Sequence, residues 1–187
     1  PLAGALASHY GLASVTGYDV LYPERFRAFM KIVNRDAPWR PPLGEDWARL
    51  EDPGSDLVDL LGIRFLVVAD APDSARIASS GLRRQFERRV WADGSAAIYE
   101  NPDPLPRAFL VHEIRNVSDA REAADSLARP GGFDFRRRAL VEGMKVWPAF
   151  GAEAGPQRAG MATLIRPRPT EVEVRVSSPA NAILVIT

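Results

Sequence analysis

The residues best suited to chemistry here are a carboxylate between two tyrosines, two histidines and several arginines. Tyr18, Asp19 and Tyr22 are close in sequence. Two aromatic faces beside a carboxylate can bind a sugar by stacking and by hydrogen bonds to its hydroxyls. Alternatively, the tyrosines pack on the following helix and Asp19 caps it, because turn carboxylates usually accept from nearby backbone donors. Asp134, which has a phenylalanine on either side, allows the same two interpretations.

The two histidines, His9 and His112, give no metal-binding pattern. Neither has a second histidine or a carboxylate at metal-ligand spacing, and the chain has no cysteine, which also excludes disulfides and thiol catalysis. His112 could act as a general base, but it lies in an expected strand, where a packed or hydrogen-bonded histidine is more common. No serine has nucleophile-elbow context and no glycine-rich loop has phosphate-binding spacing. We therefore expect no catalytic residue, no metal and no cofactor.

Arginines form two groups in a chain that is otherwise neutral. One group is Arg83, Arg84, Arg88 and Arg89, and the other is Arg136, Arg137 and Arg138. Either group could contact phosphate head groups or a lipid-linked phosphate. The commoner explanation is solvated positions paired with Glu87 and other nearby acids.

Arg107 stands apart from these groups, after a proline and before an apolar strand. This position predicts either that Arg107 pairs with another group of the protein in a structural role or that it binds an anion. Together with Tyr18, Asp19 and Tyr22 it completes our set of candidate ligand-binding residues.

The composition and net charge of the chain exclude some classes of function. The 187 residues are 46% hydrophobic and 26% charged, as in ordinary globular proteins. With 24 basic and 24 acidic residues the formal net charge is +0, which argues against general nucleic-acid binding. The longest apolar stretch, Leu57 to Ala69, contains Asp59 and Arg64 and is too short to span a bilayer. Because the chain begins with Pro1 and stops just after an apolar run, we expect a fragment of a longer protein.

The hydrophobic patterns predict an α+β fold, with a mixed sheet and flanking helices in residues 1–132 and a β-rich, sandwich-like unit, possibly truncated, in residues 133–187. An Asp-Gly pair at residues 93–94 indicates a hairpin. The expected helices are residues 23–34, 55–62, 74–81 and 118–127. The expected strands are residues 12–18, 63–69, 86–91, 96–99, 108–117, 138–146, 158–166, 170–176 and 182–186.

Several segments, taken in order, resemble the extracytoplasmic C-terminal region of bacterial YfhO-type membrane proteins, which are similar to GT-C glycosyltransferases. The segments are Tyr10–Asp19, Pro23–Phe26, Leu57–Leu66, Tyr99–Pro102, Leu105–Val111 and Phe133–Arg137. The resemblance covers about residues 8 to 140, and the ordered set is more specific than any single motif.

The resemblance implies a domain on the outer face of the bacterial cell membrane, whose parent transfers a sugar from a polyprenyl-phosphate donor. The catalytic acids would then lie upstream, between membrane helices. The expected partners are the membrane-embedded part of the same chain and a glycan or lipid-linked sugar, with no nucleic acid. Two alternatives remain open, namely an independent carbohydrate-binding module and a soluble enzyme that uses His112 or Asp19.

Overall fold

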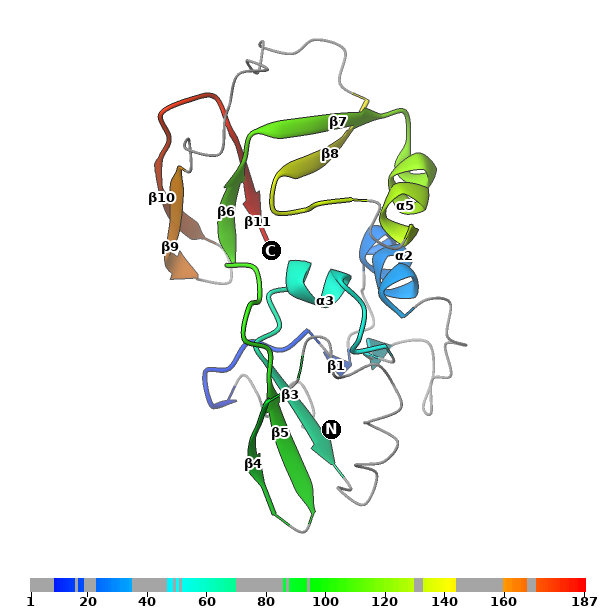
Figure 1. Cartoon of the computed structure of the whole chain (residues 1–187), viewed down its shortest axis with the longest axis vertical. Helices are drawn as coiled ribbons and strands as arrows, with labels where there is room; N and C mark the ends of the chain where they lie inside the picture. Colours follow the sequence, from blue (N-terminus) through cyan, green and yellow to red (C-terminus); the bar gives the residue numbers. More distant parts are fainter. Residues whose placement is uncertain are drawn as a thin grey trace. The chain divides into compact units, whose positions relative to one another are not determined.

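The computed structural model describes residues 9–15, 17–18, 23–34, 47–48, 50, 52–69, 86, 88–93, 95–129, 133–143, 160–167 and 171–187. It confirms an α+β fold, in which helices accompany several small and mostly antiparallel sheets (Figure 1). The chain divides into two compact units, Pro1–Pro104 and Leu105–Thr187. Each unit is described separately below.

The first unit contains two described helices of three or more residues. Helix α2, Glu24–Val33, follows Pro23 and buries Met30 and Val33, whose spacing puts them on one helical face. Helix α3, Leu57–Leu60, buries Leu57 and Val58, and Gly62 follows it with φ 63, a conformation that suits glycine. The short strands β1, Gly17–Tyr18, and β2, Trp47–Ala48, pair in antiparallel fashion.

A three-stranded antiparallel sheet forms the rest of the described first unit. Its order is β3, Phe65–Ala69, then β5, Ala96–Glu100, then β4, Arg88–Ala92. The β4–β5 hairpin turns at the Asp-Gly pair, as the sequence predicts. A bulge between Arg89 and Trp91 shifts the register of β4 against β5.

In the second unit the apolar run 108–117 does not form the single strand that we expected. It divides at His112 into β6, Ala108–Val111, and β7, Glu113–Val117. Strand β6 pairs in antiparallel fashion with β11, Ile183–Ile186. Strand β7 pairs in parallel with β8, Arg138–Glu142. The prediction was wrong at this point because the pattern of apolar and polar residues continues through His112. The partner strand changes there, from β11 for β6 to β8 for β7.

Helix α5, Ala120–Ala128, lies between β7 and β8 in the sequence and contacts both strands. This strand–helix–strand arrangement is the ordinary way to connect parallel strands. The parallel pair joins β7 to β8, which lie on opposite sides of position 132 in the sequence, where we expected the boundary between the two units. After β8, Gly143 has φ 68.

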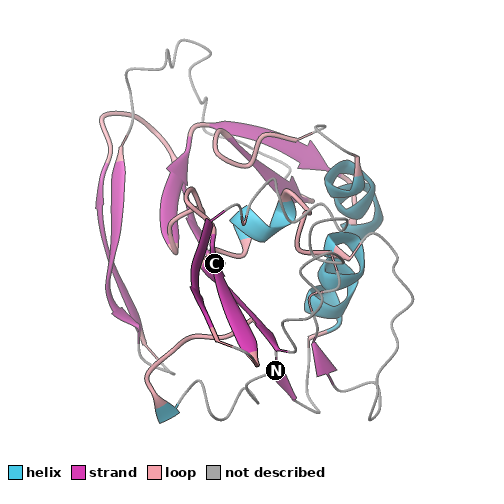
Figure 2. Ribbon diagram, turned by 60° about the horizontal axis from the view of Figure 1, so that its bottom comes forward, coloured by secondary structure: helices cyan, strands magenta, loops and turns pink. Residues whose placement is uncertain are grey.

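Strands β9, Met161–Pro167, and β10, Val172–Ser177, form an antiparallel pair (Figure 2), and β9 also lies beside β6. Gly160 permits the close approach at the start of β9. A Cβ at this position would lie 2.5 Å from Leu110 Cδ1 and 2.8 Å from the carbonyl oxygen of Ser177. The remaining predicted helix, residues 74–81, lies outside the described residues.

Candidate functional site

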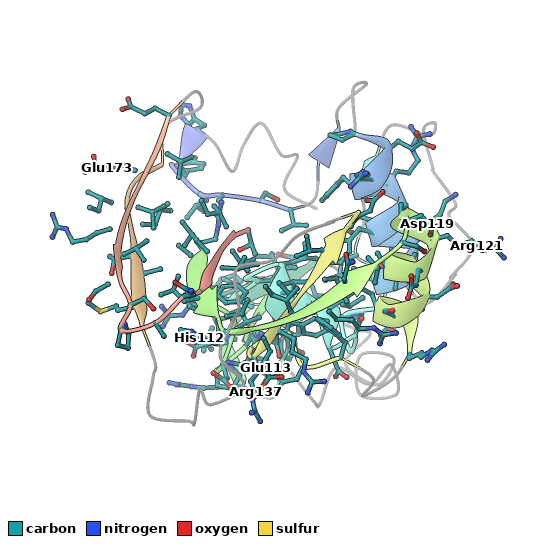
Figure 3. The ribbon with its side chains drawn as sticks, turned by 90° about the horizontal axis from the view of Figure 1, so that it is seen from above. His112, Glu113, Asp119, Arg121, Arg137 and Glu173 are labelled. Carbon is teal, nitrogen blue, oxygen red and sulfur yellow. The ribbon has the colours of Figure 1, made fainter. Side chains whose placement is uncertain are left out.

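The first charged cluster joins the starts of β7 and β8. The parallel register places Glu113 opposite Arg138. Arg138 Nε donates to Glu113 Oε2, and an Arg137 guanidinium nitrogen lies 3.1 Å from Glu113 Oε1. The Glu113 backbone N–H also donates to the Arg137 carbonyl oxygen at 3.1 Å. We call Glu113, Arg137 and Arg138 the Glu113 cluster; two of its members, Glu113 and Arg137, are labelled in Figure 3.

The hydrogen bond between Glu113 and Arg138 favours the charged form of both groups. The hydrogen bond from Arg138 is the main cause that lowers the pKa of the Glu113 carboxyl, and the charges of both arginines add to it. The same hydrogen bond raises the pKa of Arg138. All three side chains are well exposed, with relative accessibilities of 37% for Glu113, 67% for Arg137 and 53% for Arg138. An ion pair this exposed contributes little to stability.

The second charged cluster lies on the sheet of the first unit. Glu100 of β5 contacts Arg64 through Oε1 at 3.3 Å and Arg88 through Oε2 at 3.4 Å. The Glu100 side chain is 15% exposed, whereas those of Arg64 and Arg88 are 66% and 75% exposed. We call these three residues the Glu100 cluster. One carboxylate therefore holds two guanidinium groups, both of which remain open to solvent.

Exposed apolar side chains continue from the Glu100 cluster along the same side of the sheet. The register places Phe65, Glu100 and Arg88 in one row, and Val67, Ile98 and Trp91 in a row two residues further along. Of these apolar residues, Phe65 is 51% exposed, Val67 43% and Trp91 48%. The guanidinium carbon of Arg64 lies 5.3 Å from the centre of the Phe65 ring. We call Phe65, Val67 and Trp91 the apolar face.

A buried asparagine fixes the end of β5 next to the Glu100 cluster. Asn101 Nδ2 donates to Asp59 Oδ1 at 2.7 Å and to the carbonyl oxygen of Ile63 at 3.1 Å. Its backbone N–H donates to the Arg64 carbonyl oxygen at 2.8 Å, and its Oδ1 accepts from the Asp103 N–H. Asn101 is 2% exposed. Sequence reasoning did not single it out, although an Asn-Pro pair signals a turn.

Two other described carboxylates, those of Asp93 and Glu122, accept from donors close in sequence. Asp93 accepts from the backbone N–H and hydroxyl of Ser95 and from the Ala96 N–H, and the Ser95 backbone hydrogen bond is the main cause that lowers the pKa of Asp93. The Ser118 backbone N–H donates to Glu122, which chiefly lowers the pKa of Glu122. These are turn and capping interactions.

The Asp119 carboxylate accepts from the Glu122 backbone N–H at 2.8 Å, which caps helix α5. The sequence allowed either Ser118 or Asp119 as this cap. Asp134 also accepts from its own turn. Its Oδ1 accepts from the Arg136 N–H, and its carbonyl oxygen accepts from the N–H groups of Arg137 and Arg138. This contact favours the local interpretation of Asp134 over sugar binding.

The four predicted ligand-binding residues are only partly covered by the structure. The backbone of Tyr18 pairs with Trp47 in β1 and β2, while Asp19 and Tyr22 lie outside the described residues. Arg107 Nε donates to the Thr187 carbonyl oxygen at 2.7 Å, and the Thr187 N–H donates back to the Arg107 carbonyl oxygen at 3.0 Å. Arg107 thus closes the end of the β6–β11 pair. Whether any of the four binds a ligand stays a prediction.

His112 occupies the division between β6 and β7. Its Nδ1 lies 3.1 Å from the Asn181 carbonyl oxygen, and because a carbonyl only accepts, Nδ1 carries the proton in this contact. Its Nε2 is buried and has no hydrogen-bond partner among the described residues. This contact gives His112 a structural role at the strand junction.

Within the described residues, no three histidine or acidic side chains gather in a way that could hold a metal ion. No described helix is long and apolar enough to cross a membrane. Comparisons with protein-family models, curated proteins and solved structures gave no match to this chain.

Proposed function

We propose that this chain is a non-catalytic extracytoplasmic domain of a polytopic bacterial membrane protein that resembles polyprenyl-phosphate-sugar-dependent glycosyltransferases. In this proposal it acts as a scaffold, or positions the acceptor, over a reaction centre in the membrane-embedded part of the chain. The ordered segments that resemble YfhO-type proteins motivate the setting.

Five described carboxylates that already bind other groups of the chain support the scaffold role. Glu100 and Glu113 each bind two arginines, while Asp93, Asp119 and Glu122 bind backbone N–H groups. Glycosyl transfer by acid and base requires carboxylates that are directed at a substrate. Side chains already used to hold strands and turns are better suited to support than to chemistry.

An activity assay tests the absence of catalysis. The 187-residue chain is incubated with a radiolabelled polyprenyl-phosphate sugar and an acceptor glycan, and released or transferred sugar is measured. We expect no turnover above the protein-free control. Turnover that disappears in His112→Ala or Asp19→Asn would overturn the proposal in favour of a soluble enzyme.

A second experiment tests the scaffold role in the full-length parent. Sugar transfer in membranes is compared between the parent and a variant that lacks this domain. The two proteins are compared at equal amounts in the membrane. We expect the deletion to lower transfer, whereas unchanged transfer would contradict the proposal. Saturable glycan binding by the 187-residue chain, lost in Tyr18→Ala with Tyr22→Ala, would instead support a carbohydrate-binding module.

A further inference from the structure

We propose that the apolar face and the Glu100 cluster together bind the surface of an anionic lipid bilayer. The inference names a lipid partner that the scaffold proposal leaves open, and it rests on that proposal only for the location of the domain at a membrane. The binding itself is argued from the sheet alone.

The first argument is the combination of side chains on one side of the sheet. Phe65, Val67 and Trp91 come from two strands and are each between 43% and 51% exposed. Large apolar side chains gathered on a surface commonly mark a binding site. Tryptophan and phenylalanine are favoured at the boundary between lipid head groups and acyl chains, where an apolar ring meets polar surroundings.

The second argument is charge complementarity. Arg64 and Arg88 carry two positive charges against the single negative charge of Glu100, so the cluster has a net positive charge. Both guanidinium groups are more than half exposed and are held by the same carboxylate. Guanidinium groups bind phosphate through paired hydrogen bonds. Lipid phosphates can therefore bind next to acyl chains that cover the apolar face.

The two features together favour a bilayer over smaller ligands. A free phosphate ion would use the arginines and leave the apolar face in water, while a neutral apolar surface would offer no phosphate to the exposed guanidinium groups. An anionic bilayer offers both chemistries over an extended surface.

Vesicle co-sedimentation of the 187-residue chain tests this proposal. Vesicles of phosphatidylcholine alone are compared with vesicles that contain phosphatidylglycerol, at low and high salt. We expect binding only to the anionic vesicles, and weaker binding at high salt because the charge contribution is screened. Equal binding to both compositions, or binding to neither, would overturn the proposal.

Paired substitutions locate the binding surface. Arg64→Gln with Arg88→Gln is expected to weaken binding to anionic vesicles by about tenfold or more, as expected for two charges near the surface. Phe65→Ser with Trp91→Ser is expected to weaken it by roughly the same factor. Because these side chains are exposed, the variants should fold, and circular dichroism and thermal unfolding verify this.

The Glu113 cluster supplies a matched control. Arg137→Gln with Arg138→Gln removes the same charge, but β7 and β8, whose residues are all described, carry no exposed large apolar side chain. This variant is expected to bind vesicles within about twofold of the unsubstituted chain. An equal loss in both arginine pairs would show that binding follows net charge alone and would overturn the assignment to this face.

Two further measurements test whether a free anion or a second copy of the chain, and not a bilayer, binds to this surface. Millimolar inorganic phosphate should not displace the chain from vesicles, and full displacement would identify an anion site instead. Analytical ultracentrifugation should show the same mass for the unsubstituted chain and for Phe65→Ser with Trp91→Ser. A dimer lost in that variant would assign the face to a second copy and would contradict lipid binding.

Discussion

The two units each contain a glutamate that holds two arginines, but the surroundings of these clusters differ. The Glu113 cluster joins two parallel strands at their starts, and its carboxylate is 37% exposed. The Glu100 cluster lies on an antiparallel sheet next to an exposed apolar face, and its carboxylate is 15% exposed.

The difference shows that the same ionic arrangement can serve two purposes. In the second unit, Arg138 of β8 and Arg137 just before it bind Glu113 of β7, which supports a strand pairing. In the first unit, a more buried carboxylate leaves two guanidinium groups open beside apolar side chains. The residues around a charged cluster, more than its own charges, determine what the cluster can bind.

The largest expected effect comes from removing the buried asparagine that supports the Glu100 cluster. Asn101→Ala deletes side-chain hydrogen bonds to Asp59, Ile63 and Asp103 in a buried place. We expect a loss of about 3 kcal/mol, since the substitution removes three hydrogen bonds of a side chain that is 2% exposed. Amide hydrogen exchange in β3 and β5 measures it.

Asn181→Ala is the control for this substitution, because Asn181 is exposed and offers His112 only its backbone carbonyl. It should cost far less. An equal cost for both substitutions would show that Asn101 has no special role in anchoring the Glu100 cluster.

A smaller effect is expected from helix α5, which connects the two strands of the Glu113 cluster. Asp119→Ala removes the side-chain cap of α5 and should lower the free energy of unfolding by about 1 kcal/mol. Urea denaturation followed by circular dichroism measures the change. Asp125→Ala, at an exposed position of the same helix and away from the cap, is the control. Similar losses in both variants would argue against the cap.

The smallest expected effect is the acid dependence of the Glu113 cluster itself. The pKa of the Glu113 carboxyl is lower in the folded chain than its ordinary value of 4.5. Its contribution to stability is therefore present above about pH 4.5 and is lost as the pH falls through the folded pKa. A double-mutant cycle with Glu113→Gln and Arg138→Gln measures the coupling. Coupling that stays constant between pH 7 and pH 3 would contradict the ion pair.

Local patterns in the sequence predicted the elements that depend on near neighbours. The apolar spacing of Phe26, Phe29, Met30 and Val33 predicted helix α2, and Met30 and Val33 are buried while the two phenylalanines are half-buried. The Asp-Gly pair at residues 93–94 predicted the β4–β5 hairpin. Ser118 or Asp119 was predicted to cap the later helix, and the structure shows that Asp119 does so. In each case the deciding interaction spans a few residues, so the sequence contains it directly.

The partners of the arginines could not be predicted in this way. Near neighbours such as Glu87 were the expected partners of Arg88, but the partner that the structure describes is Glu100, twelve residues away in the next strand. For Arg137 and Arg138 it is Glu113, which belongs to β7. Strand register decides such pairs, and register depends on the packing of the whole sheet.

The strand junction at His112 separates β6 from β7, and each strand has its own partner. If a residue were inserted or deleted within β7, the side chains of β7 beyond that point would move to the opposite face of the sheet. The register of the β6–β11 pair would not change. We therefore expect changes in length to accumulate independently in the two halves of this segment during evolution, with position 112 as the point that separates them.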